Sequence, residues 1–399
     1  MAWRPLADIR VLDLTNVLAG PFCCHQLAHM GADVIKVEVP GSGDLARQLG
    51  ADPALNDGLM GVSFLAQNPG KRSITINLKS TRGKDIFKRL VATADVVVEN
   101  FRPGVMTRLG VGFEVLKQIN PCLIYAAISG FGQDGPLKDL PAYDQIIQGL
   151  SGLMSITGGA DTAPLRVGSP VADTIGGITA AFAIASQLAG KRDTAALVDV
   201  SMLEAVMATM GWVVSNYLIA GKEPEPFGNE NITASPSGTF QTGDGLINIA
   251  ANKQQQFEAV CRVVGRAQLI NDARFAERQG RLDRRFELKG ILEDALQSKS
   301  AADWRALLND AGVPAGQVLS VPEALAHPQI AERGMIGDFA DVAGVGRDIR
   351  LLRTGIKVDG EALRVDAPPP QLGEHTDQIL LSLGLSQDEI DSLRADKAI

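Results

Sequence analysis

The chain has 399 residues, of which 45% are hydrophobic and 21% charged, and its net charge is −8 at pH 7. This length predicts a large core, arranged either as two domains or as one domain with an insertion. The acidic balance argues against a general nucleic-acid or membrane-surface binder, and no stretch has the pattern of a membrane span or a signal peptide. The four cysteines form no C-x-x-C pair, which favours a reducing, cytoplasmic location.

Strand and helix patterns alternate along the first 130 residues. Because this alternation is typical of a parallel sheet with helices on both faces, we expect a Rossmann-like α/β domain. The turn after the first expected strand lacks the G-x-G-x-x-G motif, so we do not expect nicotinamide binding. The expected strands are residues 9–15, 32–38, 73–78, 95–99 and 123–128, and the expected helices are residues 20–30, 80–93 and 113–120.

The composition changes near Gly221, where a charged, Pro-rich linker precedes a hairpin pattern with Gly-Asp-Gly at its turn. We therefore predict a large domain of residues 1–221, completed by residues 326–399, and a smaller α+β domain of residues 222–325. The helical patterns of the smaller domain are residues 254–264, 285–297 and 302–309, and a last helix is expected from His375.

Residues 165–190 contain one acid, Asp173, between a Pro-containing loop and a long run of small apolar residues. The run is too uniformly apolar for a surface helix and predicts a buried helix of about four turns with Asp173 at its N-cap. Helix capping alone would explain this aspartate, since a capping side chain contributes ~1 kcal/mol and needs no further role. The alternative is a catalytic carboxylate at a helix N-terminus.

Basic residues are concentrated between residues 68 and 110, where nine lysines and arginines stand against three acids. Lys84, Lys88 and Arg89 are explained by the solvated face of the expected helix there. Five of the others fall in loops or at strand ends, where parallel sheets bind their ligands, so a polyphosphate ligand is a reasonable hypothesis. These residues are Lys71, Arg72, Lys79, Arg102 and Arg108.

Cys23, Cys24, His25 and His29 form a local cluster in the first expected helix. A metal site needs further ligands, and none is evident in the sequence. We therefore expect ordinary packing and no metal.

Several motifs follow one another along the whole chain. They are Val11-Leu-Asp-Leu-Thr, Ala19-Gly-Pro, Gly31-Ala-Asp-Val-Ile-Lys-Val-Glu-Val-Pro-Gly-Ser-Gly-Asp with Arg47, Lys71-Arg-Ser-Ile, Asn77-Leu-Lys, Glu99-Asn-Phe-Arg-Pro-Gly, Gly130-Phe-Gly-Gln-Asp-Gly-Pro, Tyr143-Asp, Gly152-Leu-Met, Val171-Ala-Asp and Leu372-Gly-Glu-His-Thr. In this order and spacing they resemble the class III CoA-transferases, the family of formyl-CoA transferase and carnitine CoA-transferase.

The resemblance implies that Asp173 is a nucleophile that attacks an acyl-CoA thioester and carries first the acyl group and then CoA. Gly176 and Gly177 would leave room for the thioester, and the helix N-terminus would offer N–H groups to an oxyanion. The family also implies a homodimer of interlocked subunits and CoA as a substrate rather than as a tightly bound cofactor. The positions that match CoA-binding segments are Leu18, Ala19, Ile76, Asn77, Leu78, Lys79, Asn100, Phe101, Arg102, Arg108, Leu140 and Tyr143, to which the basic excess adds Lys71 and Arg72.

Three segments resemble the succinyl-CoA:dicarboxylate branch of the family, which uses hydroxymethylglutarate, glutarate, itaconate or citramalate as acceptors. Arg166 and Arg108 are the candidates for binding the second carboxylate of such an acceptor. The branch segments are Asn252-Lys-Gln-Gln-Gln-Phe, Gly152-Leu-Met-Ser-Ile-Thr-Gly and Pro164-Leu-Arg-Val-Gly.

The chain departs from formyl-CoA transferase where Val39-Pro40 replaces an arginine, where Pro141-Ala142 replaces Lys-Val, and where residues 235–239 lack a glycine-rich loop. These departures argue against oxalate as the acceptor. Two other functions stay open: α-methylacyl-CoA racemase, whose proton-transferring histidine is replaced here by Tyr143, and a non-catalytic CoA-binding protein.

Overall fold

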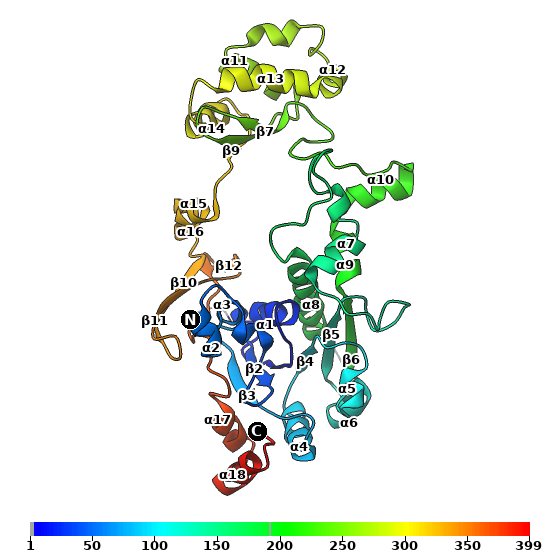
Figure 1. Ribbon diagram of the computed structural model, residues 1–399, viewed down its shortest axis with the longest axis vertical. Coiled ribbons are helices and arrows are strands. Elements are labelled where there is room, and N and C mark those ends of the chain that lie inside the picture. The colour runs from blue at the N-terminus through cyan, green and yellow to red at the C-terminus, as the bar shows by residue number, and fades with distance from the viewer. Residues whose placement is uncertain (1–3, 191–192) are drawn as a thin grey trace. The chain divides into compact units, whose positions relative to one another are not determined.

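The computed structural model describes residues 4–190 and 193–399, which form two compact units (Figure 1). Unit 1 consists of Met1–Leu153, Arg166–Lys222 and Pro328–Ile399, and unit 2 of Met154–Leu165 and Glu223–His327. The C-terminal segment thus belongs to the same unit as the N-terminal segment.

Unit 1 is built on a six-stranded sheet with the order β3-β2-β1-β4-β5-β6, in which every neighbouring pair is parallel. The expected parallel α/β sheet is confirmed. The chain moves outward from β1 to β3 and then returns to place β4 on the other side of β1, so the strand order reverses between β1 and β4. The strands are β1 (Arg10–Asp13), β2 (Asp33–Glu38), β3 (Arg72–Thr75), β4 (Val96–Glu99), β5 (Ile124–Ser129) and β6 (Ala196–Ser201).

Both faces of this sheet are buried, because successive side chains of each strand point to opposite faces and most are apolar. Leu12 and Ile35 pack on one face with the apolar sides of α4 (Thr81–Val91), α6 (Phe113–Ile119), α17 (Thr376–Ser382) and α18 (Gln387–Ala395). Val11 and Val34 pack on the other face with α1 (Ala19–His29) and α8 (Val171–Ala189). The predicted helical cover on both faces is therefore present.

Helix α8 packs closely against α1 because its contact face is made of small residues. The buried positions of α8 are Ala172, Gly176, Gly177, Ala180, Ala181 and Ile184. The prediction of a helix buried all round is wrong for the chain taken by itself, since Phe182 is 74% exposed and Ile178 is also exposed. By length and apolar composition α8 would pass for a membrane span, as would the bent pair α9 (Met202–Thr209) and α10 (Trp212–Ala220). Within unit 1, however, one face of α8 packs against α1 and the sheet.

The other elements of unit 1 are short. They are the 3-10 helix η1 (Leu45–Gln48), the helices α2 (Pro53–Asp57), α3 (Val62–Gln67), α5 (Val105–Arg108), α7 (Asp144–Leu150), α9 (Met202–Thr209), α10 (Trp212–Ala220) and α16 (Pro328–Glu332), and the antiparallel pairs β10 (Ile336–Val342) with β11 (Arg347–Leu352) and β12 (Lys357–Val358) with β13 (Glu361–Ala362).

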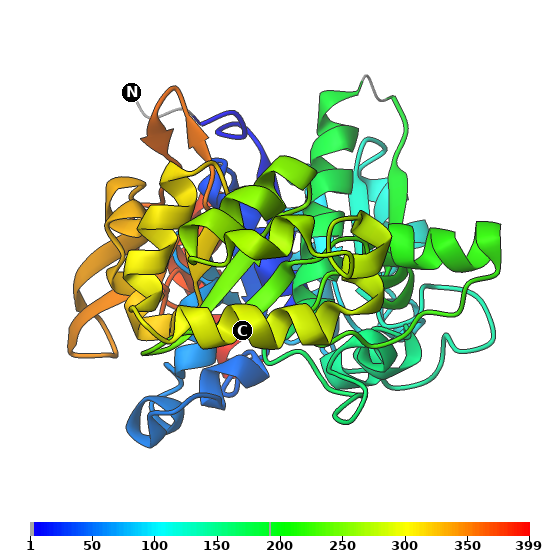
Figure 2. The ribbon, with the colours of Figure 1, turned by 90° about the horizontal axis from the view of Figure 1, so that it is seen from above.

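Unit 2 contains a three-stranded antiparallel sheet and several helices, drawn in yellow and green in Figure 2. The sheet and the helices share one apolar core. The expected hairpin forms β7 (Ser237–Gln241) and β8 (Leu246–Ala250), and β9 (Ala315–Gln317) pairs with β8. Phe257 and Trp304 are buried in this core. The helices are η2 (Met154–Ile156), α11 (Gln254–Val263), η3 (Ala267–Asn271), α12 (Arg278–Asp283), α13 (Arg285–Leu296), α14 (Ala301–Asp310) and α15 (Val321–Ala326).

Candidate active site

A cavity of about 350 Å³ lies beyond the carboxyl ends of β1 and β4, where the strand order of the sheet reverses. Open α/β sheets bind their ligands at this place, because the loops that follow the two central strands diverge there. We call it the Asp173 pocket, since Asp173 is the one carboxylate in its lining. The lining residues are Asn16, Val17, Leu18, Ala19, Leu45, Asn100, Phe101, Arg102, Pro103, Ile128, Ser129, Gly130, Lys138, Leu140, Pro141, Ala142, Tyr143, Asp173 and Met202.

Asp173 lies in the first turn of α8, three residues after Pro170, which occupies the N-cap position. The predicted N-cap role of Asp173 is therefore wrong. The proline ends the preceding loop and makes no side-chain cap, and the helix begins directly after it at Val171. Asp173 is thus not needed to cap its own helix and faces the pocket instead.

The cap of α8 is supplied by Asp144, from the first turn of α7. Its Oδ1 atom accepts hydrogen bonds from the backbone N–H groups of Ala172 (2.8 Å) and Asp173 (3.3 Å). Gln148 Nε2 donates to the other oxygen of Asp144 at 2.6 Å. The sequence analysis missed this residue. One consequence is that the N–H groups at the start of α8 are already bonded and are not available to an oxyanion.

Burial raises the pKa of Asp173 to about 7, and the neighbouring charge of Asp144 adds to this shift. A carboxyl group with this pKa is ionised in part of the molecules at neutral pH. As a carboxylate in a poorly solvated site, it is a stronger nucleophile than a carboxylate on the surface.

The start of α1 lies against the same face of α8. A Cβ atom at Gly177 would come within 2.4 Å of the carbonyl oxygen of Ala19, so only glycine permits this approach. Since residues 173 and 177 are one turn apart, Ala19 lies beside the face of α8 that carries Asp173. In the described part of the chain, the N–H groups of Leu18, Ala19 and Gly20 have no hydrogen-bond acceptor. Leu18 and Ala19 line the pocket, so their unpaired N–H groups lie beside it, whereas the N–H groups at the start of α8 are already bonded to Asp144.

Glu99 orders the loop after β4. Its carboxylate accepts hydrogen bonds from the N–H group of Phe101 (2.7 Å) and from the hydroxyl group of Tyr125 (3.3 Å). Burial raises the pKa of Glu99 to about 7, and the charge of Asp199 adds to this shift. The adjacent side chain of Asn100 forms two 2.8 Å hydrogen bonds with the backbone of Asn16 and so joins the loops after β4 and β1.

A second cavity, of about 730 Å³, adjoins the first, because Asn16 and Phe101 line both. We call it the Lys79 pocket. It contains the predicted residues Ile76, Asn77, Leu78 and Lys79, together with Arg394 and Lys397 from the C-terminal segment, which the sequence analysis missed. Asn77 forms hydrogen bonds to the carbonyl groups of Ala398 and Lys397, so the two segments form one wall.

The structure thus groups most of the predicted site residues in two adjoining pockets. Leu18, Ala19, Asn100, Phe101, Arg102, Leu140 and Tyr143 lie with Asp173, and the residues from Ile76 to Lys79 lie in the second pocket. Tyr143, at the N-cap of α7, is 67% exposed. Arg108 and Arg166 are exposed and line neither pocket.

Lys71 and Arg72 also lie outside both pockets, and their charges are matched within the chain. The Nζ atom of Lys71 is buried 2.8 Å from an oxygen of Asp13, and the guanidinium group of Arg72 binds both oxygens of Asp33. The expectation that they contact a phosphate is therefore corrected. Their partners are more than 35 residues away in sequence, so local sequence gives no sign of these pairs.

Cys23, Cys24, His25 and His29 are all buried in α1. Across residues 4–190 and 193–399, no three or more His, Cys, Asp or Glu side chains are grouped so that they could hold a metal ion.

Comparison with known proteins agrees with this geometry. The chain is 38% identical over 384 residues to succinate–glutarate CoA-transferase of Agrobacterium fabrum, a match that covers 95% of this chain and 96% of that protein. It is 41% identical over 350 residues to acetyl-CoA:oxalate CoA-transferase of Acetobacter aceti, which covers 87% and 89% of the two chains.

The fold is also shared with a solved structure, a CAIB/BAIF family protein from Brucella suis. The TM-score is 0.83 at 35% identity, with 95% of this chain and 99% of that chain covered. The family model described as CoA-transferase family III matches residues 6–376. A match of this extent, together with relatives that are similar over nearly the whole length, shows that the chain belongs to CoA-transferase family III.

Proposed function

We propose that this CoA-transferase moves CoA from an acyl-CoA donor, succinyl-CoA, to a small dicarboxylate of the itaconate, citramalate, glutarate or hydroxymethylglutarate type, with Asp173 as the nucleophile. The observation that carries the proposal is that Asp173 is the one carboxylate lining a pocket at the point where the strand order reverses. The relative that acts on succinate and glutarate supports this choice of donor and acceptor.

The reaction proceeds through covalent intermediates on Asp173. The carboxylate of Asp173 attacks the thioester carbonyl of the donor. The C–S bond breaks, CoA leaves as a thiolate, and the acyl group remains on Asp173 as a mixed anhydride. The thiolate then attacks the aspartyl carbonyl, which releases succinate and forms an aspartyl-CoA thioester. The acceptor carboxylate then attacks that thioester, and CoA leaves again as a thiolate, which leaves the acceptor joined to Asp173 as an anhydride. The thiolate attacks the acceptor carbonyl of this anhydride, which releases acceptor-CoA and restores Asp173. No proton is gained or lost overall.

Each of these additions places negative charge on a carbonyl oxygen. The N–H groups of Leu18, Ala19 and Gly20 are the donors proposed to stabilise it, since they are unpaired and lie beside the same face of α8. This assignment replaces the start of α8, whose N–H groups are bonded to Asp144.

CoA is proposed to extend from the Asp173 pocket into the Lys79 pocket. The apolar side chains of Ile76, Leu78 and Phe101 suit the adenine ring and the pantetheine arm, and Lys79 suits a phosphate. Arg102 and Lys138 line the Asp173 pocket and are exposed, so they are better placed than Arg108 or Arg166 to bind a second acceptor carboxylate.

We also propose a homodimer. Beyond Ile178 and Phe182 of α8, the exposed apolar side chains include Trp212, Leu218 and Ile219 of α10, which has no buried residue in the single chain. Apolar surface of this kind supports association with a second subunit. All four cysteines are free, which supports a reducing, cytoplasmic location.

The decisive experiment is trapping of the intermediate. The protein is incubated with succinyl-CoA, treated with hydroxylamine or borohydride, digested and analysed by mass spectrometry. We expect a modification on the peptide that contains Asp173, and no modification in Asp173→Asn. An active wild-type enzyme with no adduct on that peptide would overturn the mechanism.

The acceptor is identified with a panel of dicarboxylates assayed with succinyl-CoA. The panel includes oxalate with acetyl-CoA as donor, because one relative carries that name. Highest kcat/KM with oxalate would contradict the proposed acceptor class but not the aspartyl mechanism. Exchange of the α-proton of a 2-methylacyl-CoA for deuterium, without any acceptor acid, would instead identify a racemase.

A further inference from the structure

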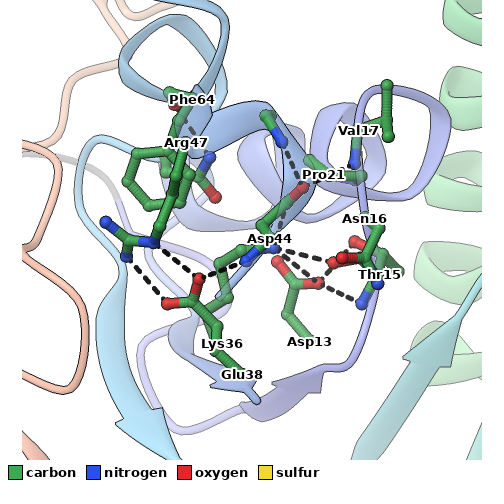
Figure 3. Close-up of polar contacts among 12 residues, drawn as sticks. Asp13, Thr15, Asn16, Val17, Pro21, Lys36, Glu38, Asp44, Arg47 and Phe64 are labelled. Carbon is green, nitrogen blue, oxygen red and sulfur yellow. Dashed lines mark hydrogen bonds and ion pairs between the residues drawn. The ribbon is translucent and has the colours of Figure 1, made fainter. Parts of the chain in front are cut away.

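The motif Gly41-Ser-Gly-Asp44 with Arg47 supplies no reacting group to the proposed chemistry, although Gly41, Gly43 and Asp44 line the Lys79 pocket. It belongs to an unusual feature of the molecule. Six charged side chains are buried together beneath the loop that follows β1 (Figure 3). Three are acids and three are bases, so the cluster is neutral. We call it the buried charge cluster, and its members are Asp13, Lys36, Glu38, Asp44, Arg47 and Lys71.

The cluster forms because charged residues occupy one face of two neighbouring strands. Asp13 of β1 and Lys36 of β2 are register partners, so both side chains point to the same face of the sheet. The Nζ atom of Lys36 lies 2.9 Å from Asp44 Oδ2, and that of Lys71 lies 2.8 Å from Asp13 Oδ2. Burial alone would raise the pKa of Asp13, but the charges of Lys36 and Lys71 lower it to about 2. Asp13 is therefore ionised at neutral pH.

Residues 15–17 form a turn after β1. Side chains of the buried charge cluster and of Asn100 bind each backbone N–H and carbonyl group of this turn, from the N–H of Thr15 to the N–H of Val17. Asp13 accepts from the N–H of Thr15 at 2.9 Å, and Lys36 donates to its carbonyl oxygen at 2.8 Å. Asn100 binds both groups of Asn16. Asp44 Oδ1 accepts from the N–H of Val17 at 2.9 Å. This turn leads directly to Leu18 and Ala19 at the Asp173 pocket.

Val17 has a backbone conformation that its side chain disfavours. Its φ angle is +67°, in the left-handed region, which is rare for a β-branched residue and costs on the order of 1–3 kcal/mol. Such a conformation persists only where the surroundings impose it. Asp44 makes the side-chain hydrogen bond to this residue, and the same oxygen accepts from the N–H of Ala46 at 2.9 Å.

We propose that Asp44 is a positioning residue, whose carboxylate keeps Val17 in the left-handed conformation and thereby directs the first turn of α1 toward Asp173. If Val17 relaxed to its preferred conformation, the chain would leave the turn in another direction, and the N–H groups of Leu18 and Ala19 would move away from the pocket. The proposal rests on the proposed function in one respect, the role of these N–H groups in stabilising the oxyanion.

Stability alone does not account for this arrangement. A buried group of ion pairs adds little to the free energy of folding compared with apolar side chains of the same volume, because each charge must be stripped of water. Here one acid of the cluster also maintains a strained residue at the edge of the pocket. Strain of this kind gathers at functional sites, where geometry matters more than stability.

The test uses a suppressor. Asp44→Ala removes the contact to Val17, and we expect the rate of adduct formation on Asp173 to fall by about 100-fold, the typical effect of a displacement of about 1 Å. Val17→Gly supplies the reference rate, because Val17 lines the Asp173 pocket and glycine adopts positive φ without strain. In the double variant, glycine should restore the rate at least 10-fold over Asp44→Ala. No restoration would overturn the proposal, because a residue needed only for stability would not respond to Val17→Gly.

Arg47→Met is the matched control. It removes a charge from the same cluster, where Arg47 pairs with Glu38, whereas the N–H group of Val17 is bound by Asp44. Val17→Gly should therefore not restore any activity that Arg47→Met loses. Restoration there would mean that glycine acts generally, and the proposal would fail.

Val17→Pro covers the case in which Asp44→Ala does not fold. Proline excludes positive φ and leaves every charge in place, so adduct formation at the wild-type rate in that variant would refute the proposal.

Hydrogen exchange distinguishes this proposal from the proposed function. In the peptide that contains Thr15 and Asn16, amide exchange should be faster in Asp44→Ala than in wild type and slow again in the double variant. If the wild-type protein forms no adduct but shows this exchange pattern, the positioning role stands and the proposed reaction fails. Unchanged exchange in Asp44→Ala would reject the positioning role, whatever the reaction.

Discussion

Asp173 combines two properties at the scale of a single residue: it faces a pocket, and its pKa is raised by burial and by Asp144. A protonated carboxyl group does not attack a thioester, so the rate of adduct formation should rise with pH and reach half of its maximum near pH 7. Single-turnover measurements with succinyl-CoA between pH 5.5 and about 8.5 check this. In Asp144→Asn the midpoint should move to lower pH, because the neighbouring negative charge is gone. A flat profile would contradict the role of Asp173 as nucleophile.

The same shift in pKa predicts how Asp173 affects the stability of the folded protein. In the unfolded chain Asp173 titrates near 3.8, and in the folded protein near 7. Between these values the folded state keeps a proton that the unfolded state has lost, so this group lowers the free energy of unfolding as the pH rises from about 4 to about 7 and has a constant effect above that.

Asp173→Asn should therefore be more stable than the wild type at pH 8, by on the order of a few kcal/mol, although it is inactive. The advantage should shrink as the pH falls below 7, because the wild-type side chain then carries a proton and resembles the amide. Chemical denaturation of both proteins at pH 5 and pH 8 measures the difference. If Asp173→Asn were less stable than the wild type at pH 8, the buried charge of Asp173 would not lower the free energy of unfolding, and the prediction would be wrong.

At the scale of elements, the contact between α1 and α8 brings the unpaired N–H groups at the start of α1 close to Asp173, the proposed nucleophile. Gly177→Ala would place a methyl group 2.4 Å from the carbonyl oxygen of Ala19, and backbone cannot move aside as a side chain can. We expect a loss of about 1–3 kcal/mol in stability and a larger relative loss in kcat than in substrate binding. Denaturation and steady-state kinetics measure the two effects.

Gly290→Ala in α13 is the control for this substitution. A Cβ atom there would meet nothing within 4 Å, and the residue lies within a helix. Alanine should thus leave the protein equally stable or more stable by up to ~1 kcal/mol, with unchanged activity. Equal effects at the two positions would mean that the close contact of α1 with α8 is unimportant.

The elements also show how far the sequence predicts the structure. The parallel sheet, its helical cover and the hairpin of unit 2 follow from local patterns that the chain repeats several times. The start of α8 did not follow, because the cap comes from Asp144 in another helix and not from the residue before the helix. Likewise, the excess of basic residues does not show which lysine is available to a ligand. Lys79 lines a pocket, whereas Lys71 is paired with an aspartate 58 residues earlier in the chain.

At the scale of the whole molecule, unit 1 is assembled from distant parts of the chain, and the Lys79 pocket has walls from both ends of it. Lys397→Ala should raise the KM for acyl-CoA about 3- to 10-fold, because an exposed lysine near a phosphate contributes ~1 kcal/mol. The KM for the acceptor acid should not change. Lys88→Ala, on α4 and outside both pockets, serves as the control, and an equal effect of both substitutions would argue against phosphate binding in this pocket.

The hydrogen bond from Asn77 to the carbonyl oxygen of Lys397 spans 320 residues of sequence. During synthesis on a ribosome, the strand before Asn77 emerges long before the segment that completes its pocket, and the apolar face that α17 and α18 will cover stays open in the meantime. Contacts of such separation also form slowly, because a long loop must close before they contribute. Under the proposed function, the nascent chain can therefore bind CoA in the Lys79 pocket only when translation is nearly finished. This face of the sheet is where a chaperone would be needed most.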